Sequence, residues 1–591
     1  MVASEEKHRF RSHKNTSIVK FAGVILTLLT ISLVFFKDKF NFEASTEIHQ
    51  DTDTSFLDKV QDFNILGKDK CPLSVPLTPT FEKYDLNNIF GNETFIDLAA
   101  EKLSGAIKIN TSIGDKPPSP KENIDYWAPF FEFHEYLEQA FPLVHEKLVL
   151  EKVNEVGLLY KWEGSNPDLK PMLFMAHQDV VPVNEKTLDQ WKYPAFSGYY
   201  DKEEQMIWGR GSLDCKNLLI AELHTLEVLL EQGFVPKRTI LLSLGFDEES
   251  SGVHGASSLS KHLLNTLGPD SIYSVIDEGA GFSKITDKFF IAYPILNEKG
   301  RVDVKITVDG HGGHSSNPPL SGHTNIGILA KIISLMEDTG FENQYSEQNS
   351  LWQFLECIAK YDDELDPKFR EVILKRDVSS YYKEKLLKTL SSLMEFKDLI
   401  KTSQAFDIVS GGVKANALPE DAYAVVNHRI DFGSSVKEVL ERDLEMAKVI
   451  AKTYEYGLAM EDKVIIPETA NGMIKVEQFG DAVEPAPISP QNDVYDIFKK
   501  TIYNTFVNGV MKDNKDDEIT FVVSPNSVTL NTDTQYYWNL TSNIYRFQFL
   551  EFNTKVIKSL HSVNEAIGSQ HHASTIGFLY DYVLNVNEYH S

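Results

Sequence analysis

The chain is poor in cysteine. Its 591 residues include three cysteines, Cys71, Cys215 and Cys357, which is too few for the disulfide framework of a small secreted scaffold. Cys71 and Cys357 could form one disulfide, and the sequence leaves that pairing open. Cys215 has no cysteine or histidine close to it in sequence, so we expect it to be a small buried side chain.

Positive charge is also scarce. The chain has 58 Lys and Arg residues against 86 Asp and Glu residues, which gives a formal net charge of −28. Because a nucleic-acid-binding surface is basic, this balance argues against a nucleic-acid partner. The hydrophobic fraction of 42% argues against an intrinsically disordered chain and indicates a folded globular protein.

Long hydrophobic runs are absent apart from residues 21–36, which carry no charged side chain. As a helix this run would span about 24 Å, a little less than the roughly 30 Å of a bilayer core. Basic residues precede it and the charges after it nearly cancel, so the positive-inside rule predicts a single-pass type II membrane protein. A cleaved signal peptide is the alternative, but the run ends in Phe35-Phe36 rather than in small residues. The predicted order is a cytosolic tail (1–20), a transmembrane signal-anchor (21–36) and a lumenal stalk (37–75).

The part of the chain after the anchor carries three N-glycosylation sequons. Their acceptors are Asn92, Asn110 and Asn539. If this part is lumenal, the three asparagines are predicted to be glycosylated on the surface.

After the stalk, apolar strands alternate with amphipathic helices. Residues 216–231 have a broad apolar stripe at helical spacing, and residues 239–246 form an apolar run typical of a buried strand. The alternation predicts an α/β fold with a mostly parallel sheet and helices on both faces. From about residue 299 the pattern changes to half-buried strands and longer helices, which indicates an inserted α+β domain. The predicted boundaries are 76–298 and 485–591 for the two parts of the α/β domain and 299–484 for the insertion.

Four separated fragments supply residue types that bind metal ions: His177, Asp214, Glu249 and Asp277. They are 37, 35 and 28 residues apart, which is about one strand-helix-strand unit per step. Successive strands of one sheet would then deliver these side chains to its carboxyl edge, where open α/β folds bind ligands. The spacing predicts a metal-centred hydrolase.

Two ions and a base can be assembled from these fragments. A carboxylate can bridge two ions because each oxygen binds one, and Asp214 is the candidate. His177 and Glu249 add an imidazole and a carboxylate, a donor set that suits zinc. Glu248, directly before Glu249, is the candidate general base for the attacking water. Asp179 is placed to accept the second ring N–H of His177 and so to fix its orientation.

Three motifs resemble those of a known family. They are His-Gln-Asp-Val-Val-Pro at 177–182, Gly-Arg-Gly-Ser-Leu-Asp-Cys-Lys at 209–216 and Asp-Glu-Glu-Ser-Ser-Gly at 247–252. Together they resemble a zinc exopeptidase family that includes carboxypeptidase S of yeasts, aminoacylase, carnosinase-type dipeptidases and bacterial glutamate carboxypeptidase. The resemblance covers about residues 70–591, and within the family it points to the carboxypeptidase S group.

The resemblance implies two zinc ions per subunit. His177 and Asp277 would bind different ions and Asp214 would bridge them. Glu249 would complete the shell of one ion, and His561 would be the last ligand, on the other ion. Family members use either acid of the Asp277-Glu278 pair, and the alignment favours Asp277. Without the resemblance, His561 could not be preferred over the histidines at 571 and 572.

The inserted domain resembles the lid or dimerisation domain of the same family. His314 would stabilise the developing oxyanion, and Asn416 and Arg429 would hold the substrate. A guanidinium fork suits the free carboxylate that Arg429 would grip. A homodimer through the lid is compatible with this resemblance, and whether His314 and Arg429 serve their own site or a partner's stays open.

These implications define a dinuclear-zinc metallocarboxypeptidase that releases C-terminal amino acids from short peptides of the Gly-Xaa type. The resemblance also implies the fungal vacuole as its location. The alternative is an aminoacylase-like hydrolase or synthase of N-acyl amino acids, whose substrates present the same amide beside a free carboxylate. A non-catalytic, receptor-like relative is disfavoured because all six proposed ligand and base positions are present.

Overall fold

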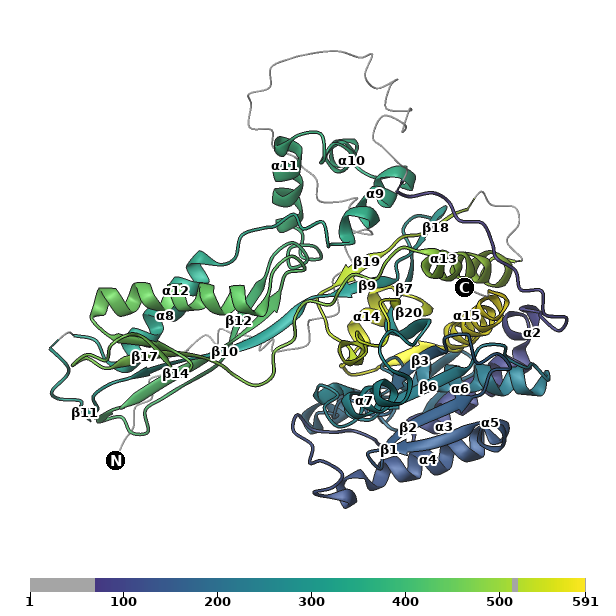
Figure 1. Cartoon of the computed structure of the whole chain (residues 1–591), viewed down its shortest axis with the longest axis horizontal. Coiled ribbons are helices and arrows are strands. Elements are labelled where there is room, and N and C mark those ends of the chain that lie inside the picture. The colour runs from purple at the N-terminus through teal and green to yellow at the C-terminus, as the bar shows by residue number, and fades with distance from the viewer. Residues whose placement is uncertain (1–69, 321, 513–518, 590–591) are drawn as a thin grey trace, which may run out of the picture.

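The computed structural model describes residues 70–320, 322–512 and 519–589. They form an α/β domain and an elongated arm that extends from it (Figure 1). The α/β domain contains a ten-stranded sheet in the order β1-β2-β6-β3-β7-β20-β9-β19, with β8 pairing β7 and β18. The strands are β1 (Val149–Val153), β2 (Gly157–Trp162), β3 (Met172–His177), β6 (Ile240–Gly245), β7 (Ser274–Lys284), β8 (Phe289–Ala292), β9 (Ile295–Glu298), β18 (Thr520–Val523), β19 (Asn526–Val528) and β20 (Ile544–Glu551).

This sheet is mixed, which corrects the expectation of a mostly parallel one. β3 runs parallel to β6 and β7, and β7 runs parallel to β20. However, β1-β2, β2-β6 and β7-β8 are antiparallel pairs. Short connections such as those between β1 and β2 and between β7 and β8 force antiparallel pairing, and a short apolar run has the same pattern in either direction. The strands next to the candidate site are nevertheless the parallel ones.

Helices cover both faces of the sheet, as predicted. Phe174 of β3 belongs to the core formed with α3 (Glu93–Ile107), α6 (Lys216–Glu231) and α15 (Ser569–Glu588). Its neighbours Leu173 and Met175 belong to a separate core with α7 (Ala256–Leu267). Because successive side chains of a strand point to opposite faces, one strand supplies both cores.

Local sequence signals explain where the helices begin and end. α6 has the bounds that its apolar stripe predicts, and α12 spans Val436–Tyr454. Ser435 accepts a hydrogen bond from the backbone N–H of Glu438 at the start of α12, the arrangement found at helix N-termini with Glu at the third position. Gly268 follows α7 with φ of +86°, a conformation that glycine adopts without a steric penalty.

The arm is built on a six-stranded sheet in the order β12-β14-β10-β17-β15-β16. α8 (Asn325–Thr339) and α12 share an apolar core with this sheet. The short strands β11 (Gly313–His314) and β13 (Ala417–Leu418) pair with each other at the end of the arm far from the α/β domain (Figure 1). The sheet consists of β10 (Gly300–Asp309), β12 (Ser403–Gly411), β14 (Asp421–Ile430), β15 (Gly457–Met460), β16 (Lys463–Ile466) and β17 (Met473–Gln478).

A helical segment interrupts the arm and packs on the α/β domain. It contains α9 (Leu351–Tyr361), α10 (Pro367–Leu374) and α11 (Ser380–Ser391). Its apolar side chains share a core with Phe289 and Ile291 of β8 and Val522 of β18. The insertion therefore contains both a projecting sheet and a helical part that is held against the first domain.

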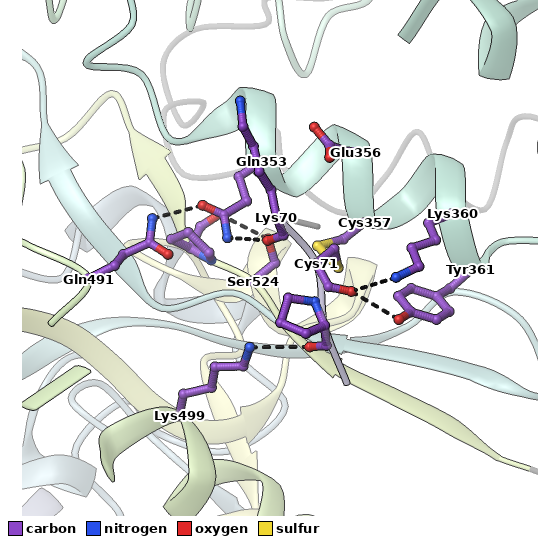
Figure 2. Close-up of a disulfide and its surroundings, with 12 residues drawn as sticks. Lys70, Cys71, Gln353, Glu356, Cys357, Lys360, Tyr361, Gln491, Lys499 and Ser524 are labelled. Carbon is purple, nitrogen blue, oxygen red and sulfur yellow. Dashed lines mark hydrogen bonds between the residues drawn. A yellow bond between two sulfur atoms is a disulfide. The ribbon is translucent and has the colours of Figure 1, made fainter. Parts of the chain in front are cut away.

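One disulfide fixes the start of the described chain to this helical segment (Figure 2). It joins Cys71 to Cys357 of α9, with a Cα–Cα distance of 5.5 Å. The carbonyl oxygen of Cys71 also accepts hydrogen bonds from Lys360 Nζ at 3.1 Å and from the Tyr361 hydroxyl at 2.9 Å. The pairing that the sequence left open is thus present, and Cys215 is free and buried as expected.

The predicted cytosolic tail, transmembrane segment and most of the predicted stalk fall in residues 1–69, outside the described residues. Within residues 70–589, apart from the undescribed positions 321 and 513–518, no helix is long and apolar enough to cross a membrane. The anchor therefore stays a prediction.

Candidate metal centre

The candidate centre lies where β3, β6 and β7 reach one edge of the sheet. His177 is the last residue of β3, and Glu249 follows β6 in a short 3-10 turn. Asp214 does not come from a strand of this sheet, in contrast to the prediction. It lies in the loop between β5 (Met206–Trp208), a strand of a small separate sheet, and α6. His561 lies between α14 (Thr554–Ser559) and β21 (Ala566–Gly568).

Asp214 lies between the two histidines. Its Oδ1 is 3.1 Å from His177 Nε2 and its Oδ2 is 2.9 Å from His561 Nε2. Burial acts to raise the pKa of Asp214, but hydrogen bonds to His177 and His561 outweigh it and hold that pKa well below its usual range. Each oxygen of one carboxylate thus faces a different imidazole, which is the arrangement that a bridging ligand requires.

Asp179 contacts both the turn that carries Glu248 and Glu249 and the ring of His177. Its Oδ1 accepts the backbone N–H of Glu248 at 3.2 Å, and its Oδ2 accepts that of Glu249 at 3.0 Å. His177 Nδ1 lies 3.0 Å from the Asp179 carbonyl oxygen and 3.3 Å from Asp179 Oδ1. The ring is therefore oriented mainly by the backbone of Asp179, while the carboxylate holds the turn that carries the two glutamates.

The acid of β7 that lies close to His177 is Glu278, whereas the resemblance favoured Asp277 as the ligand. Glu278 Oε1 is 3.7 Å from His177 Nε2. Asp277 is 3% exposed and belongs to none of the groups of potential ligand atoms among the described residues. Consecutive residues of a strand point to opposite faces, so only one of these two acids can face His177. Glu278 and His177 share one group of potential ligand atoms. The expectation was instead that His177 and the acid of β7 would bind different ions.

Potential ligand atoms gather in groups within 4.8 Å of one another. Asp214, Glu249 and His561 form one group, and His561 Nε2 is 3.4 Å from Glu249 Oε1. His177 and Glu278 form another with Cys215, and His177, Glu248 and Glu249 form a third. Burial, followed by the charge of Glu278, raises the pKa of the Cys215 thiol, so this side chain is a poor source of thiolate.

The carboxylates crowd one another. Burial and then the charge of Asp214 raise the pKa of Glu249 to about 7. Burial and then Glu278 raise the pKa of Glu248 well above its usual range. Buried carboxylates gathered around two imidazoles are the donors that zinc takes, and the surplus of negative charge is what divalent cations would neutralise. The residues present therefore fit bound divalent metal ions.

The predicted residues of the arm do not join this cluster. His314 and Asn416 are exposed in and next to the β11-β13 ladder, far from the metal centre in the same chain (Figure 1). Arg429 of β14 lies at the base of the arm, where its guanidinium donates to Asn531 Oδ1 of the α/β domain at 3.0 Å. Arg301 is its direct partner across β10 and β14. The sequence pattern gave no signal for Arg301 or Asn531, because neither belongs to a ligand-like motif.

Comparisons with known proteins agree with this geometry. Residues 173–585 match the model of peptidase family M20/M25/M40. Carboxypeptidase S of Saccharomyces cerevisiae is 48% identical over 522 residues, which cover 88% of this chain and 89% of that protein. The N-fatty-acyl-amino acid synthase/hydrolase PM20D1 of Bos taurus is 32% identical over 497 residues, covering 82% and 87%. The chain therefore belongs to this peptidase family and is a hydrolase, as its motifs predict.

A solved structure gives the same fold. The M20 family metallo-carboxypeptidase Sso-CP2 from Sulfolobus solfataricus superposes with a TM-score of 0.53 at 20% identity, covering 83% of this chain and 99% of that one. At this identity the likeness defines the fold, which is the α/β fold of the family with mixed sheets and helices.

Proposed function

We propose that this chain is a dinuclear-zinc carboxypeptidase that releases C-terminal amino acids from short peptides of the Gly-Xaa type. The observation that carries the proposal is Asp214, whose two oxygens face two histidines from distant parts of the chain at 3.1 and 2.9 Å. The similarity to carboxypeptidase S supports the substrate class. Zinc bound at such a site makes water nucleophilic near neutral pH and polarises the scissile carbonyl.

Two ligand sets follow from the distances. His177 and Glu278 would hold one ion, Glu249 and His561 would hold the other, and Asp214 would be shared by both. Glu248 lies in reach of His177 and Glu249 but is left over once both sets are complete, and its raised pKa suits a group that accepts a proton from the attacking water. It then passes that proton to the leaving amine.

The revised ligand on β7 can be tested by comparing two neighbours. We expect Glu278→Gln to lose about one zinc ion per subunit and to lower kcat by roughly 10²-fold or more, because weakened metal ligation commonly costs 10- to 100-fold in affinity. Asp277→Asn is the matched control and should keep both ions. Metal analysis by mass spectrometry together with turnover of a Gly-Leu derivative measures both effects. If Asp277→Asn loses zinc and turnover while Glu278→Gln keeps both, Asp277 is the ligand.

The substrate carboxylate is proposed to bind at Arg429. This side chain is half-buried at the junction of the arm and the α/β domain. Its nearby acids, Asp303 and Asp407, act on it through charge, and its side-chain hydrogen bond goes to Asn531. Burial, followed by repulsion from Arg301, lowers its pKa, but arginine stays charged at physiological pH. A guanidinium whose fork is not occupied by a bidentate carboxylate is well suited to a free carboxylate.

His314 and Asn416 are proposed to act on the site of a second subunit. Both are exposed at the end of the arm far from their own metal centre (Figure 1). The edge strand β12 beside them carries exposed Ile408 and Val409, and an open apolar edge of this kind favours pairing with another chain. A homodimer through the arm would then bring His314 to the partner's substrate, where it stabilises the oxyanion.

Subunit mixing tests this arrangement. We expect His314→Ala and Arg429→Ala to lower kcat/KM by about 10- to 10³-fold each, the range found when one oxyanion or substrate contact is removed. A mixture of the two variants, refolded or co-expressed, should recover up to about a quarter of wild-type turnover, because half of the subunits are in hybrid dimers and each hybrid has one intact site. The same mixture of two His314→Ala preparations is the control. If the hybrid shows no recovery while both proteins are dimeric, His314 acts in its own subunit.

Two substrate classes compete for this site. N-acyl amino acids present the same amide beside a free carboxylate, and the similarity to N-fatty-acyl-amino acid synthase/hydrolase PM20D1 makes them the second candidate. Turnover of a blocked Gly-Leu dipeptide and of a fatty-acyl leucine should be compared at equal enzyme concentration. A higher kcat/KM for the dipeptide is expected, and preference for the fatty-acyl substrate would replace the peptidase proposal.

The proposed location is the lumen of the vacuole, with the predicted anchor making the chain a type II membrane protein. Similarity to carboxypeptidase S and the Cys71–Cys357 disulfide support this placement, since disulfides persist in oxidising compartments. The acceptors of the three sequons, Asn92, Asn110 and Asn539, are all exposed, as glycosylation requires.

A further inference from the structure

Glu565 is a buried carboxylate that joins the two loops carrying Asp214 and His561. It is 0% exposed and follows His561 by four residues. Its Oε1 accepts backbone N–H groups of the Asp214 loop, from Gly211 at 3.0 Å, Leu213 at 2.8 Å and Asp214 at 3.3 Å. Both of its oxygens form hydrogen bonds with residues 210–214, and among the described residues Glu565 belongs to none of the groups of potential metal ligands.

The second oxygen of Glu565 forms a buried ion pair. Arg210 Nη1 donates to Glu565 Oε2 at 2.5 Å, and Arg210 is 3% exposed. The Arg210 guanidinium also faces the ring of Trp191 at 5.6 Å. The cost of burying a charge is offset only where the charge is paired and hydrogen-bonded, and both oxygens of Glu565 meet these conditions.

Backbone hydrogen bonds also join the loop that carries Asp214 to the loop that carries His561. The N–H of Gly209 donates to the Glu565 carbonyl at 2.9 Å, and β21, which begins at Ala566, pairs antiparallel with β5. The two loops are about 350 residues apart in sequence, so no local turn fixes their separation. Glu565 is the side chain that accepts hydrogen bonds from three backbone positions of the other loop, at Gly211, Leu213 and Asp214.

We infer that Glu565, held by Arg210, is the positioning residue that sets the distance between Asp214 and His561. The inference rests on the proposed two-ion site. Asp214 and His561 would share one ion, and their separation has to be kept to a fraction of an ångström for that ion to bind tightly. Carboxylates behind metal ligands tune affinity by about 10- to 100-fold, and Glu565 does so through the backbone of the bridging residue.

The test compares Glu565→Gln with Glu227→Gln. Glu227 is a matched control because it is 4% exposed and also accepts two backbone N–H groups, from Leu143 at 3.1 Å and Val144 at 2.8 Å, at the start of α5 (Pro142–Lys147). We expect Glu565→Gln to weaken zinc affinity, measured by competition with a chromogenic chelator, by about 10- to 100-fold. Its kcat should fall while KM for the peptide stays near wild type, since Glu565 does not reach the substrate. Glu227→Gln should keep wild-type zinc affinity even if its melting temperature falls.

Wild-type zinc affinity in folded Glu565→Gln would overturn the inference. If Glu565→Gln does not fold, Arg210→Lys decides, because it keeps the charge and removes the fork: a 10-fold or larger loss of zinc affinity supports the inference and no change refutes it. A wild-type protein that binds two zinc ions but releases no amino acid from peptides would refute the proposed substrate alone, and the affinity comparison would still decide the role of Glu565.

Discussion

Glu248→Gln is expected to lower kcat by about 10²- to 10⁴-fold, the range that a positioned general base contributes. The amide cannot accept the proton of the attacking water, although its size and its hydrogen-bonded backbone are unchanged. Asp179 would still accept the backbone N–H of residue 248, so the turn that also carries Glu249 should keep its shape. The variant should therefore bind zinc as the wild type does.

Glu249→Gln provides the contrast, because it alters the neighbouring residue in the same turn. Glu249 lies in the group with Asp214 and His561, so its variant should lose zinc as well as turnover. Zinc content and single-turnover rates of the two variants separate a base from a ligand. If Glu248→Gln turns over peptide at the wild-type rate, Glu248 is not the base.

The sequence predicted the residue types of the site better than their positions in the fold. His177 and Glu249 do follow neighbouring parallel strands, as the apolar runs before them indicated. Asp214 has the expected spacing but reaches the centre from a loop before α6. Spacing counts residues and cannot distinguish a strand of the main sheet from a small hairpin that folds beside it.

The choice between Asp277 and Glu278 depended on strand orientation. Two adjacent acids on a strand have the same composition and burial pattern, and only the direction in which β7 presents its side chains separates them. The position of His561 depended on tertiary structure in the same way. It lies 2.9 Å from Asp214, whereas His572 is fully buried in α15, a difference that no local pattern at these positions contains.

The insertion was predicted as one α+β domain, but its parts have different surroundings. The apolar residues of α9 to α11 are spaced as those of any amphipathic helix, so their partners could not be read from the sequence. In the structure they pack on β8 and β18, and Cys357 of α9 is bonded to Cys71. This contact ties the base of the arm to the α/β domain, and only the sheet beyond it projects far from the metal centre (Figure 1).

The largest effect on metal binding is expected for Asp214→Asn, because Asp214 is the one residue shared by both proposed ligand sets. The neutral amide has a single oxygen, so it cannot place one oxygen toward His177 and another toward His561, as the Asp214 carboxylate does. We expect both zinc ions to bind much more weakly and kcat/KM to fall by at least about 10⁴-fold, since enzymes commonly exceed the uncatalysed rate by 10⁶-fold or more.

His561→Ala is the control that distinguishes a bridge from an ordinary ligand. His561 belongs to one set only, so this variant should retain about one zinc ion per subunit, whereas Asp214→Asn should retain close to none after dialysis against a mild chelator. Metal analysis and peptide turnover on the same preparations give both quantities. If Asp214→Asn keeps two ions, the two sites are independent, and the bridging role assigned to its carboxylate is wrong. Equal loss in both variants would instead mean that the second ion cannot bind without the first, and stepwise zinc titration of the wild-type protein would then show a single cooperative transition.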